Sequence, residues 1–394
     1  MSLEFQGCVK PTLGVEVEVQ LIDRTSKDLA AAAEAVLKRA EGVEDLCLKS
    51  ELTVAMVEIN TKICANVREV AEDLSRQMDR LRGIANSQGL KIAVSGTHPF
   101  QDWRERRIFP DQRHTHLLEK FQWLARRWTT FGLHVHVGVK NGERAIAILN
   151  ALIPYIPHLL ALSASSPFWG GTDTGLASCR AAVTESFPTG GLPYFLPGWK
   201  EFEKFFETLQ ATGAIGSIKD LYWDIRPHYD FGTIEVRVFD GIPTLHETLA
   251  LVALVQCLVV WIDDQLEKGG RTGQIRMQRY WTAPENKWQA ARYGLEGHII
   301  LREGEDRRPI KEEIEKLLEI LKPAAATLNC AEELSWVRDI LRSGSSADRQ
   351  RRIFAETRSL KAVVDALIAE LQENRTIEES VFGSPPLRLL PILP

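Results

Sequence analysis

Two histidines spaced two residues apart, His134 and His136, are the starting point for the chemistry of this sequence. They lie in the segment 131–139, FGLHVHVGV, where apolar residues alternate with the two histidines and a glycine. This period of two predicts a strand with one apolar face and one face that carries two imidazoles. Imidazole binds divalent metals and exchanges protons near neutral pH, so the polar face is a candidate for chemistry.

Two more segments have the same design, with acids and an arginine in place of the histidines. Glu16 and Glu18 alternate with apolar residues in LGVEVEVQLI at 13–22, and Glu235 and Arg237 do so in GTIEVRVFD at 232–240. If the three strands share one sheet, their polar faces form a common hollow, here termed the cup. The cup is lined by Glu16, Glu18, His134, His136, Glu235 and Arg237.

The cup also has a simpler interpretation. An antiparallel sheet often leaves one face to water, and a glutamate or arginine there is commonly just solvated. A solvated face normally mixes Thr, Ser and Lys, however, whereas these strands repeat acids and histidines beside glycines. Carboxylate oxygens with one or two imidazoles form the donor set of a Mg²⁺ or Mn²⁺ site. The three strands together therefore favour a metal site.

Two further glutamates, Glu51 and Glu58, follow in the chain. In one regular strand they would point to opposite faces, because they are an odd number of residues apart. Both can face the cup only if a turn or bulge lies between them, near residues 53–55. The other histidines of this part have no partner spacing and are interpreted as surface or loop residues: His98, His114 and His116.

Composition narrows the class of protein. The 394 residues, 44% hydrophobic and 26% charged, are typical of a globular protein with one large domain or two. A net charge of -5 without a long basic tract argues against nucleic acid as a partner. Six cysteines without a C-x-x-C pair, and a start without an apolar leader, predict reduced thiols in the cytoplasm.

Several helices are expected to support the strands. Helical spacing or propensity predicts helices near 29–41, 67–89 and 113–130. The apolar run 248–262 is about 15 residues long, too short to cross a bilayer, so we expect a buried helix and no membrane partner. A second apolar run, 146–162, contains two prolines and should form a kinked or two-part helix.

The rest of the chain divides into loops and a helical end. Segments 163–175 and 184–194 are rich in Gly, Pro, Ser and Thr and are expected to be loops of the kind that form functional lids. Segments 309–321 and 347–371 are strongly helical in pattern. The proline-rich end, 385–394, is expected to dock on the surface or fray. Neither a G-x-x-x-x-G-K-[ST] nor a G-x-G-x-x-G motif occurs.

With these residues in place, the sequence resembles the carboxylate-amine ligase family, the glutamate-cysteine ligase type 2 group. The matching stretches are TLGVEVE (12–18), FGLHVHV (131–137), FPTGGLP (187–193), DIRPH (224–228) with GTIEVR (232–237), and ENKW (285–288) through RYGL (292–295). Single motifs of this kind would be weak. They occur in the family's order from about residue 11 to 296, which makes the resemblance specific.

The resemblance implies an α+β fold of the glutamine-synthetase type, a curved and mainly antiparallel sheet flanked by helices. We expect one catalytic domain over 1–394, with a sheet-bearing core at 11–300 and a C-terminal helical part at 305–375. The resemblance also implies ATP-dependent joining of a carboxylate, that of glutamate or a similar acid, to an amine such as that of cysteine. The carboxylate would be activated as an acyl phosphate.

The family's pattern also implies a set of ligands for Mg²⁺, with Mn²⁺ as an alternative. Arg237 follows the last acid of the set, as the pattern requires. His136 matches the family's second histidine, either as a ligand or as a hydrogen-bond partner. The implied ligands are Glu16, Glu18, Glu51, Glu58, His134 and Glu235.

Cationic side chains are needed on the transferred phosphoryl group and on the substrate carboxylates, because guanidinium binds such oxygens through two hydrogen bonds. The candidate catalytic residues are, in order, Arg237, Arg226, Arg180 and Arg292. Arg237, Arg226 and His136 are also the candidates for contacting the nucleotide. A surface or structural salt bridge is the alternative for the last three arginines.

Two other functions would use the same residues. A metal-dependent oxygenase or hydrolase of the cupin kind needs a glutamate three or four residues after His136, where Val139 and Lys140 stand. A non-catalytic sensor of nucleotide or amino acid would have to bear the repulsion of the converging acids without any gain in chemistry. The ligase is therefore the favoured function, with small-molecule substrates and a symmetric homodimer as the default assembly.

Overall fold

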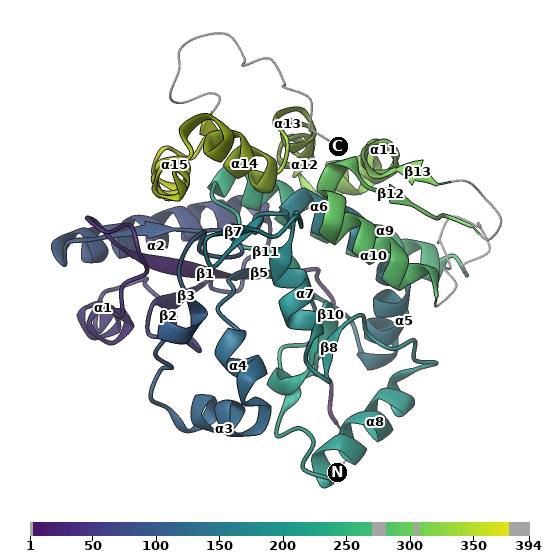
Figure 1. Ribbon diagram of the computed structural model, residues 1–394. Coiled ribbons are helices and arrows are strands. Elements are labelled where there is room, and N and C mark those ends of the chain that lie inside the picture. Colours follow the sequence, from purple (N-terminus) through teal and green to yellow (C-terminus); the bar gives the residue numbers. More distant parts are fainter. Residues whose placement is uncertain (1–2, 270–280, 303–306, 378–394) are drawn as a thin grey trace.

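The computed structural model describes residues 3–269, 281–302 and 307–377. A seven-stranded sheet runs through its middle (Figure 1). Its order in space is β10 (Ile225–His228), β11 (Thr233–Asp240), β5 (Gly132–Gly138), β1 (Leu13–Asp23), β3 (Met56–Asn60) and β2 (Leu48–Ser50), with β4 (Leu90–Ala93) also paired to β1. The pairs within this sheet are antiparallel, which confirms the predicted α+β class with an antiparallel sheet.

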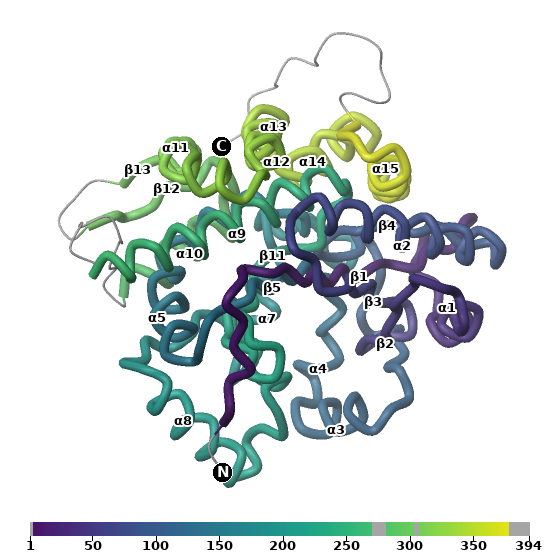
Figure 2. The backbone as a smooth tube through the Cα atoms, turned by 180° about the vertical axis from the view of Figure 1, so that it is seen from behind, coloured from purple at the N-terminus to yellow at the C-terminus, as the bar shows by residue number. Residues whose placement is uncertain are grey.

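The apolar face of the sheet is covered by helices that cross it. Strand residues such as Val17, Val135 and Val236 are buried in one hydrophobic core with these helices. The helices are α2 (Val67–Ser87), α5 (Gly142–Leu152), α6 (Ile156–Ser163) and α9 (Leu245–Glu267). Seen from behind, α2 and α9 lie over the sheet (Figure 2). The alternating pattern of the strands thus places one face in the core and leaves the other to the cup.

Two apolar helical segments have the length and composition of membrane spans. They are Gly142–Ser163, with 22 residues, and Leu245–Glu267, with 23 residues, and 83% of the apolar window of each is buried inside the protein. The buried helix predicted at 248–262 is therefore confirmed, although it is longer than its apolar run. The first segment is divided by a 3₁₀ turn, Ile153–Tyr155, where the prolines predicted a kink.

The opposite face of the sheet is bordered by other helices (Figure 1). They are α3 (Gln112–Phe121), α4 (Trp123–Arg127), α7 (Cys179–Glu185) and α8 (Trp199–Ala211). The single helix predicted at 113–130 is wrong, because Gln122 has a φ of 46° and separates α3 from α4. A left-handed residue ends a helix, and sequence periodicity does not reveal it. His116 is exposed and His98 lies in a loop, but His114 is buried in α3, against the surface interpretation.

The C-terminal helices lie on the far side of the sheet from α3 and α8 (Figure 1). They are α10 (Thr282–Tyr293), α11 (Ile310–Leu328), α12 (Ala331–Ser335), α13 (Val337–Ser343), α14 (Ser346–Thr357) and α15 (Leu360–Glu373). Helices α11, α12 and α13 pack on α9, and α15 packs on β4. The segment 347–371 is helical as predicted, and it is divided into α14 and α15 near Arg358, which has a φ of 54°. The proline-rich end at 385–394 lies outside the described residues.

The remaining elements are short. Those that occur in the predicted loops are β6 (Phe168–Trp169), β7 (Thr172–Asp173) and β8 (Gly190–Gly191), so these loops are partly ordered by pairing. The others are α1 (Ala33–Ala40), β9 (Tyr222–Trp223), β12 (His298–Ile299) and β13 (Arg308–Pro309).

Candidate active site

The register of the sheet brings the predicted residues of the cup together on one face. Glu16 lies directly opposite His134 in the pairing of β1 with β5. Glu235 lies directly opposite His136 in the pairing of β11 with β5. Residues opposite each other on neighbouring strands have Cβ atoms about 4.5–5.5 Å apart. Strand pairing therefore places one acid beside each histidine, Glu16 beside His134 and Glu235 beside His136.

A second side of the cup is made of three glutamates. Glu18 lies opposite Glu58 in the pairing of β1 with β3. Glu51 follows β2, and the chain turns at residues 54–55 before β3 begins. This turn lies where the odd spacing required one, and it lets both Glu51 and Glu58 line the same cavity as Glu18.

Ligand atoms in the cup gather into three groups of the size that a metal ion needs. Within each group, one donor atom per residue lies within 4.8 Å of the others. The groups are Glu16–His136–Glu235, Glu16–Glu58–His134 and Glu18–Glu51–Glu58. Glu16 and Glu58 each belong to two groups, so the three positions form one continuous cluster across the sheet.

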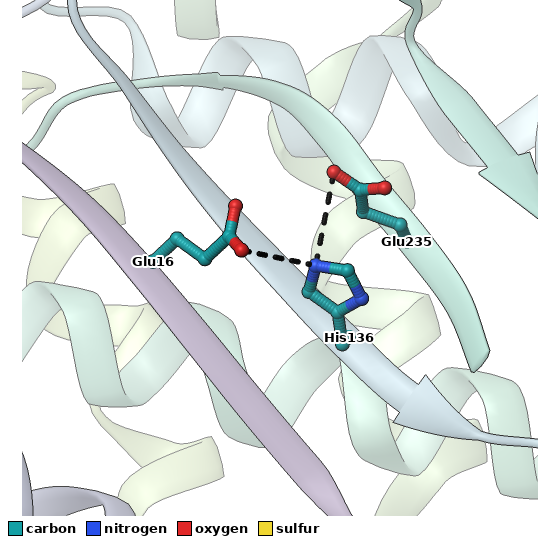
Figure 3. A group of neighbouring side chains, drawn as sticks. All are labelled: Glu16, His136 and Glu235. Carbon is teal, nitrogen blue, oxygen red and sulfur yellow. Dashed lines mark ion pairs between the residues drawn. The ribbon is translucent and has the colours of Figure 1, made fainter. Parts of the chain in front are cut away.

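His136 is oriented to direct one ring nitrogen at two carboxylates. Its Nδ1 lies 3.0 Å from the hydroxyl of Thr233. Its Nε2 lies 3.7 Å from Oε1 of Glu16 and 3.7 Å from Oε1 of Glu235 (Figure 3). A second hydrogen bond that fixes the ring is the usual support of a metal-binding histidine. This geometry suits His136 as a ligand through Nε2, the first of its two predicted roles.

His134 is held in a similar way by Glu16. Its Nδ1 lies 3.1 Å from Oε2 of Glu16, and its Nε2 lies 4.0 Å from Oε1 of Glu18. The Nε2 atoms of His134 and His136 are both buried and have no hydrogen-bond partner within the described ranges. A buried polar atom without a hydrogen-bond partner destabilises the folded protein, so we expect a bound ion or ligand to contact these two nitrogens.

The donor set of the cup fits hard divalent cations. Carboxylate oxygens predominate, and each imidazole sits beside at least one of them. Mg²⁺ and Mn²⁺ prefer oxygen donors and accept an occasional imidazole, whereas a zinc site would use more nitrogen or sulfur. The residues present therefore fit the predicted Mg²⁺ or Mn²⁺.

Glu235 is held between two guanidinium groups. Arg226 donates from Nε and Nη2 to the two oxygens of Glu235, at 2.6 and 3.2 Å, and Arg237 donates to Oε1. Burial alone would raise the pKa of Glu235, but the charges of Arg226 and Arg237 outweigh it and hold the pKa well below its usual value. Glu235 thus remains a carboxylate although it is fully buried.

Negative charge accumulates at the other end of the cup. Burial and the charge of Glu18 raise the pKa of Glu51 to about 7. Burial and the charge of Glu16 raise the pKa of Glu58 well above its usual value. Burial also acts to raise the pKa of Glu16, but the hydrogen bond with His134 helps to lower it to about 2. A divalent cation would relieve this repulsion between carboxylates.

The predicted arginines are not equivalent. Arg237 and Arg226 line the cup, as does Arg180, which is buried and donates to the carbonyl oxygens of Val238 and Arg237. Arg292 is not among the residues that line the cavity and donates instead to the carbonyl of Gly175. The structure therefore brings three of the four predicted arginines to the cup and leaves Arg292 outside it.

Several lining residues come from segments that the strand pattern does not cover. Asp224 stands beside the cup and forms an ion pair with the buried Lys287 of α10, with the two charged atoms 2.7 Å apart. In the sequence, these two residues stood out only because they lie in the DIRPH and ENKW stretches, which match the family's motifs. Three additional cationic residues of the lining are Lys49, Arg113 and Lys219.

The support that Thr233 gives to His136 can be tested by metal binding. We expect Thr233→Val to weaken Mn²⁺ binding by roughly 10- to 100-fold, because the ring loses the hydrogen bond that orients Nε2. The measurement is a Mn²⁺ titration followed by electron paramagnetic resonance. Thr130→Val is the matched control, since Thr130 lines the cavity and its buried hydroxyl has no partner in the described part of the chain. Equal weakening in both variants would contradict this role.

Comparisons with known proteins show the family of the chain. The family described as glutamate-cysteine ligase family 2 matches residues 12–366 of the chain. A Thermobifida fusca protein, whose name describes it as a candidate glutamate–cysteine ligase 2, is 46% identical over 387 residues, covering 97% of this chain and 96% of that protein. A Gloeobacter violaceus protein of the same name is 44% identical over 373 residues, covering 94% and 100% of the two chains.

Two solved structures share the fold. One is a glutamate–cysteine ligase from Francisella tularensis in complex with AMP, with a TM-score of 0.66 and 11% identity, covering 94% of this chain and 93% of that chain. The other is a bifunctional glutathione synthetase from Pasteurella multocida, with a TM-score of 0.67 and 13% identity, covering 92% of this chain and 52% of that chain. At such low identity the likeness concerns the fold alone, and it confirms the predicted fold class.

Proposed function

Because the chain belongs to glutamate-cysteine ligase family 2, we propose that it is an ATP-dependent ligase that forms an amide between two small molecules. The acid is glutamate or a similar compound, and the amine is that of cysteine or a related amino compound. A free carboxylate does not react with an amine in water, so the enzyme has to activate it first. ATP provides the activation by phosphorylating the carboxylate.

The observation that carries the proposal is the cup itself. Three groups of metal donors adjoin one another there, and guanidinium groups line the same cavity. Phosphoryl transfer needs little beyond positioning and neutralisation of negative charge, and this cup provides for both. The metal ligands would be Glu16, Glu18, Glu51, Glu58, His134, His136 and Glu235. When Mg²⁺ is bound, it neutralises charge on the phosphates of ATP.

Arg237 is the residue best placed to contact the transferred phosphoryl group. Its Nη1 bonds Glu235 and lies 3.4 Å from Nδ1 of His134, so the guanidinium reaches the centre of the cup. Arg226 is buried, and its donors are used by Glu235 and by the carbonyl oxygens of Ile218 and Leu221. We therefore assign Arg226 to positioning Glu235 and Arg237 to binding phosphate.

The reaction would proceed in two displacements. A carboxylate oxygen of the acid attacks the γ-phosphorus of ATP, and the bond from that phosphorus to the β,γ-bridging oxygen breaks, giving an acyl phosphate and ADP. The amine nitrogen then attacks the acyl carbon, phosphate leaves, and the nitrogen releases a proton. The cationic side chains of Lys49, Arg113 and Lys219 line the same cavity and can bind substrate carboxylates that are not consumed.

The proposal is tested by measuring ADP release with glutamate and a panel of amino compounds in the presence of Mg²⁺. We expect ADP only when ATP, an acid and an amine are all present, together with a product whose mass is the sum of acid and amine less one water. Stabilisation by ATP and Mg²⁺ without turnover of any pair would overturn the ligase and favour a sensor. Retained iron with an oxygen-dependent reaction would overturn it in favour of an oxygenase.

A further inference from the structure

An exposed aromatic ring stands at the edge of the cup. Phe231 lines the cavity, yet 55% of its surface is exposed. It lies in the turn between β10 and β11. This turn leads directly into β11, the strand that carries Glu235. Single exposed apolar side chains are common and need no explanation, but this one borders a cavity that is otherwise rich in charge.

The ring of Phe231 is fixed in place on two sides. It stacks on the ring of His228 with a centroid distance of 4.0 Å and an interplanar angle of 4°, and its centroid lies 5.7 Å from that of His136. The turn is anchored by backbone hydrogen bonds from Gln6 to Tyr229, at 2.9 Å, and from Val139 to Gly232, at 2.9 Å. Phe231 is therefore a preorganised platform rather than a mobile side chain.

The register of β11 places this platform at one end of the metal cluster. Thr233 pairs with Gly138 next to the turn, Glu235 pairs with His136 in the middle, and Asp240 pairs with Gly132 at the far end. Arg237 and the carbonyl contacts of Arg180 lie towards that far end. An extended ligand that spans the metal donors would therefore have Phe231 at one end and guanidinium groups at the other.

A polar atom beside the platform also lacks a partner. His228 lines the cavity and is 3% exposed, and its Nδ1 has no hydrogen-bond partner in the described ranges. Because the His228 ring covers one face of Phe231, with a centroid distance of 4.0 Å, a planar ligand would stack on the opposite face, and Nδ1 of His228 would lie behind the ring. A planar aromatic group without a direct contact to His228 therefore matches the platform.

We propose that Phe231 stacks the purine base of the nucleotide on the face turned away from His228. This rests on the proposed function, which gives the cup a nucleoside triphosphate as substrate. The triphosphate would extend from the base across the metal cluster, so that its terminal phosphate lies towards Arg237 and Arg180. The acid would then bind at the guanidinium end, away from Phe231.

The test compares ATP with inorganic triphosphate, which has the phosphates but no base. Binding of each to the full-length protein in Mg²⁺ is measured by calorimetry. We expect Phe231→Ala to weaken ATP binding by about tenfold, because stacking of a base on an aromatic side chain is lost. Binding of triphosphate should be unchanged, and Phe231→Trp should restore ATP binding. Phe195→Ala is the matched control, since Phe195 is 57% exposed and does not line the cavity.

The outcomes separate this inference from the proposed function. Unchanged ATP affinity in Phe231→Ala, or an equal loss for ATP and triphosphate, would overturn the stacking role while leaving the ligase in place. If the unmodified protein bound neither compound, the nucleotide itself would be excluded, and both proposals would fall.

Discussion

Glu235→Gln is expected to lower the rate of ADP release by on the order of 1,000-fold. Glutamine keeps the size of the side chain and removes its negative charge. The change takes a carboxylate from the donor group shared with Glu16 and His136. It also leaves the guanidinium groups of Arg226 and Arg237 without their common counter-charge inside the protein. The loss should therefore combine weaker metal binding with a displaced Arg237.

The measurement is steady-state ADP release over a range of Mg²⁺ concentrations, with circular dichroism as the check on folding. Glu332→Gln is the matched control, because Glu332 is exposed on α12, far along the chain from the cup strands. The control should keep full activity. A folded Glu235→Gln variant with activity within tenfold of the unmodified protein would show that this carboxylate is not part of the reaction centre.

Arg349→Met is expected to lower the free energy of unfolding by about 3–5 kcal/mol. Arg349 is 1% exposed and bonds two buried acids, Glu247 at the start of α9 and Glu370 on α15, at distances of 2.7–3.0 Å. Removing the guanidinium leaves two carboxylates facing each other without a cation in a buried position. The C-terminal helices α14 and α15 should then loosen from the core.

Denaturant unfolding followed by tryptophan fluorescence measures the change. Arg351→Met is the control from the same helix, because Arg351 pairs with Asp173 at a partly exposed position. Such a pair contributes roughly 0–1 kcal/mol, so the control should unfold close to the unmodified protein. If the two variants lost equal stability, the buried contacts of Arg349 with Glu247 and Glu370 would not be what holds the C-terminal helices on the core.

Much of the cup could be predicted from the sequence because strand alternation is a local property. Each of the three polar strands carries its chemical residues at every second position, and antiparallel pairing can bring such faces together without further information. The same rule required a turn between Glu51 and Glu58, and the chain turns at 54–55. Resemblance to a ligase family then identified the chemistry.

Other features depend on contacts that no local pattern records. The left-handed residues Gln122 and Arg358 interrupt segments whose helical periodicity continues across them. Thr233 and Phe231 gain their roles only when the strand register places them beside His136. Arg292 has the same residue type as the other candidates, but its position on α10 directs it to Gly175 instead of the cup. Residue type therefore identified the candidates, and tertiary packing selected among them.

We propose that the polar faces of these strands bind divalent cations that hold a triphosphate. A crystal structure with Mn²⁺ and ADP, with the metal identified by anomalous scattering, would show whether they do. We expect metal within coordination distance of Glu16, His136 and Glu235, with the diphosphate of ADP bound to it. Metal found only away from these three side chains, or ADP bound outside the cup, would show that the cup is not the nucleotide and metal site.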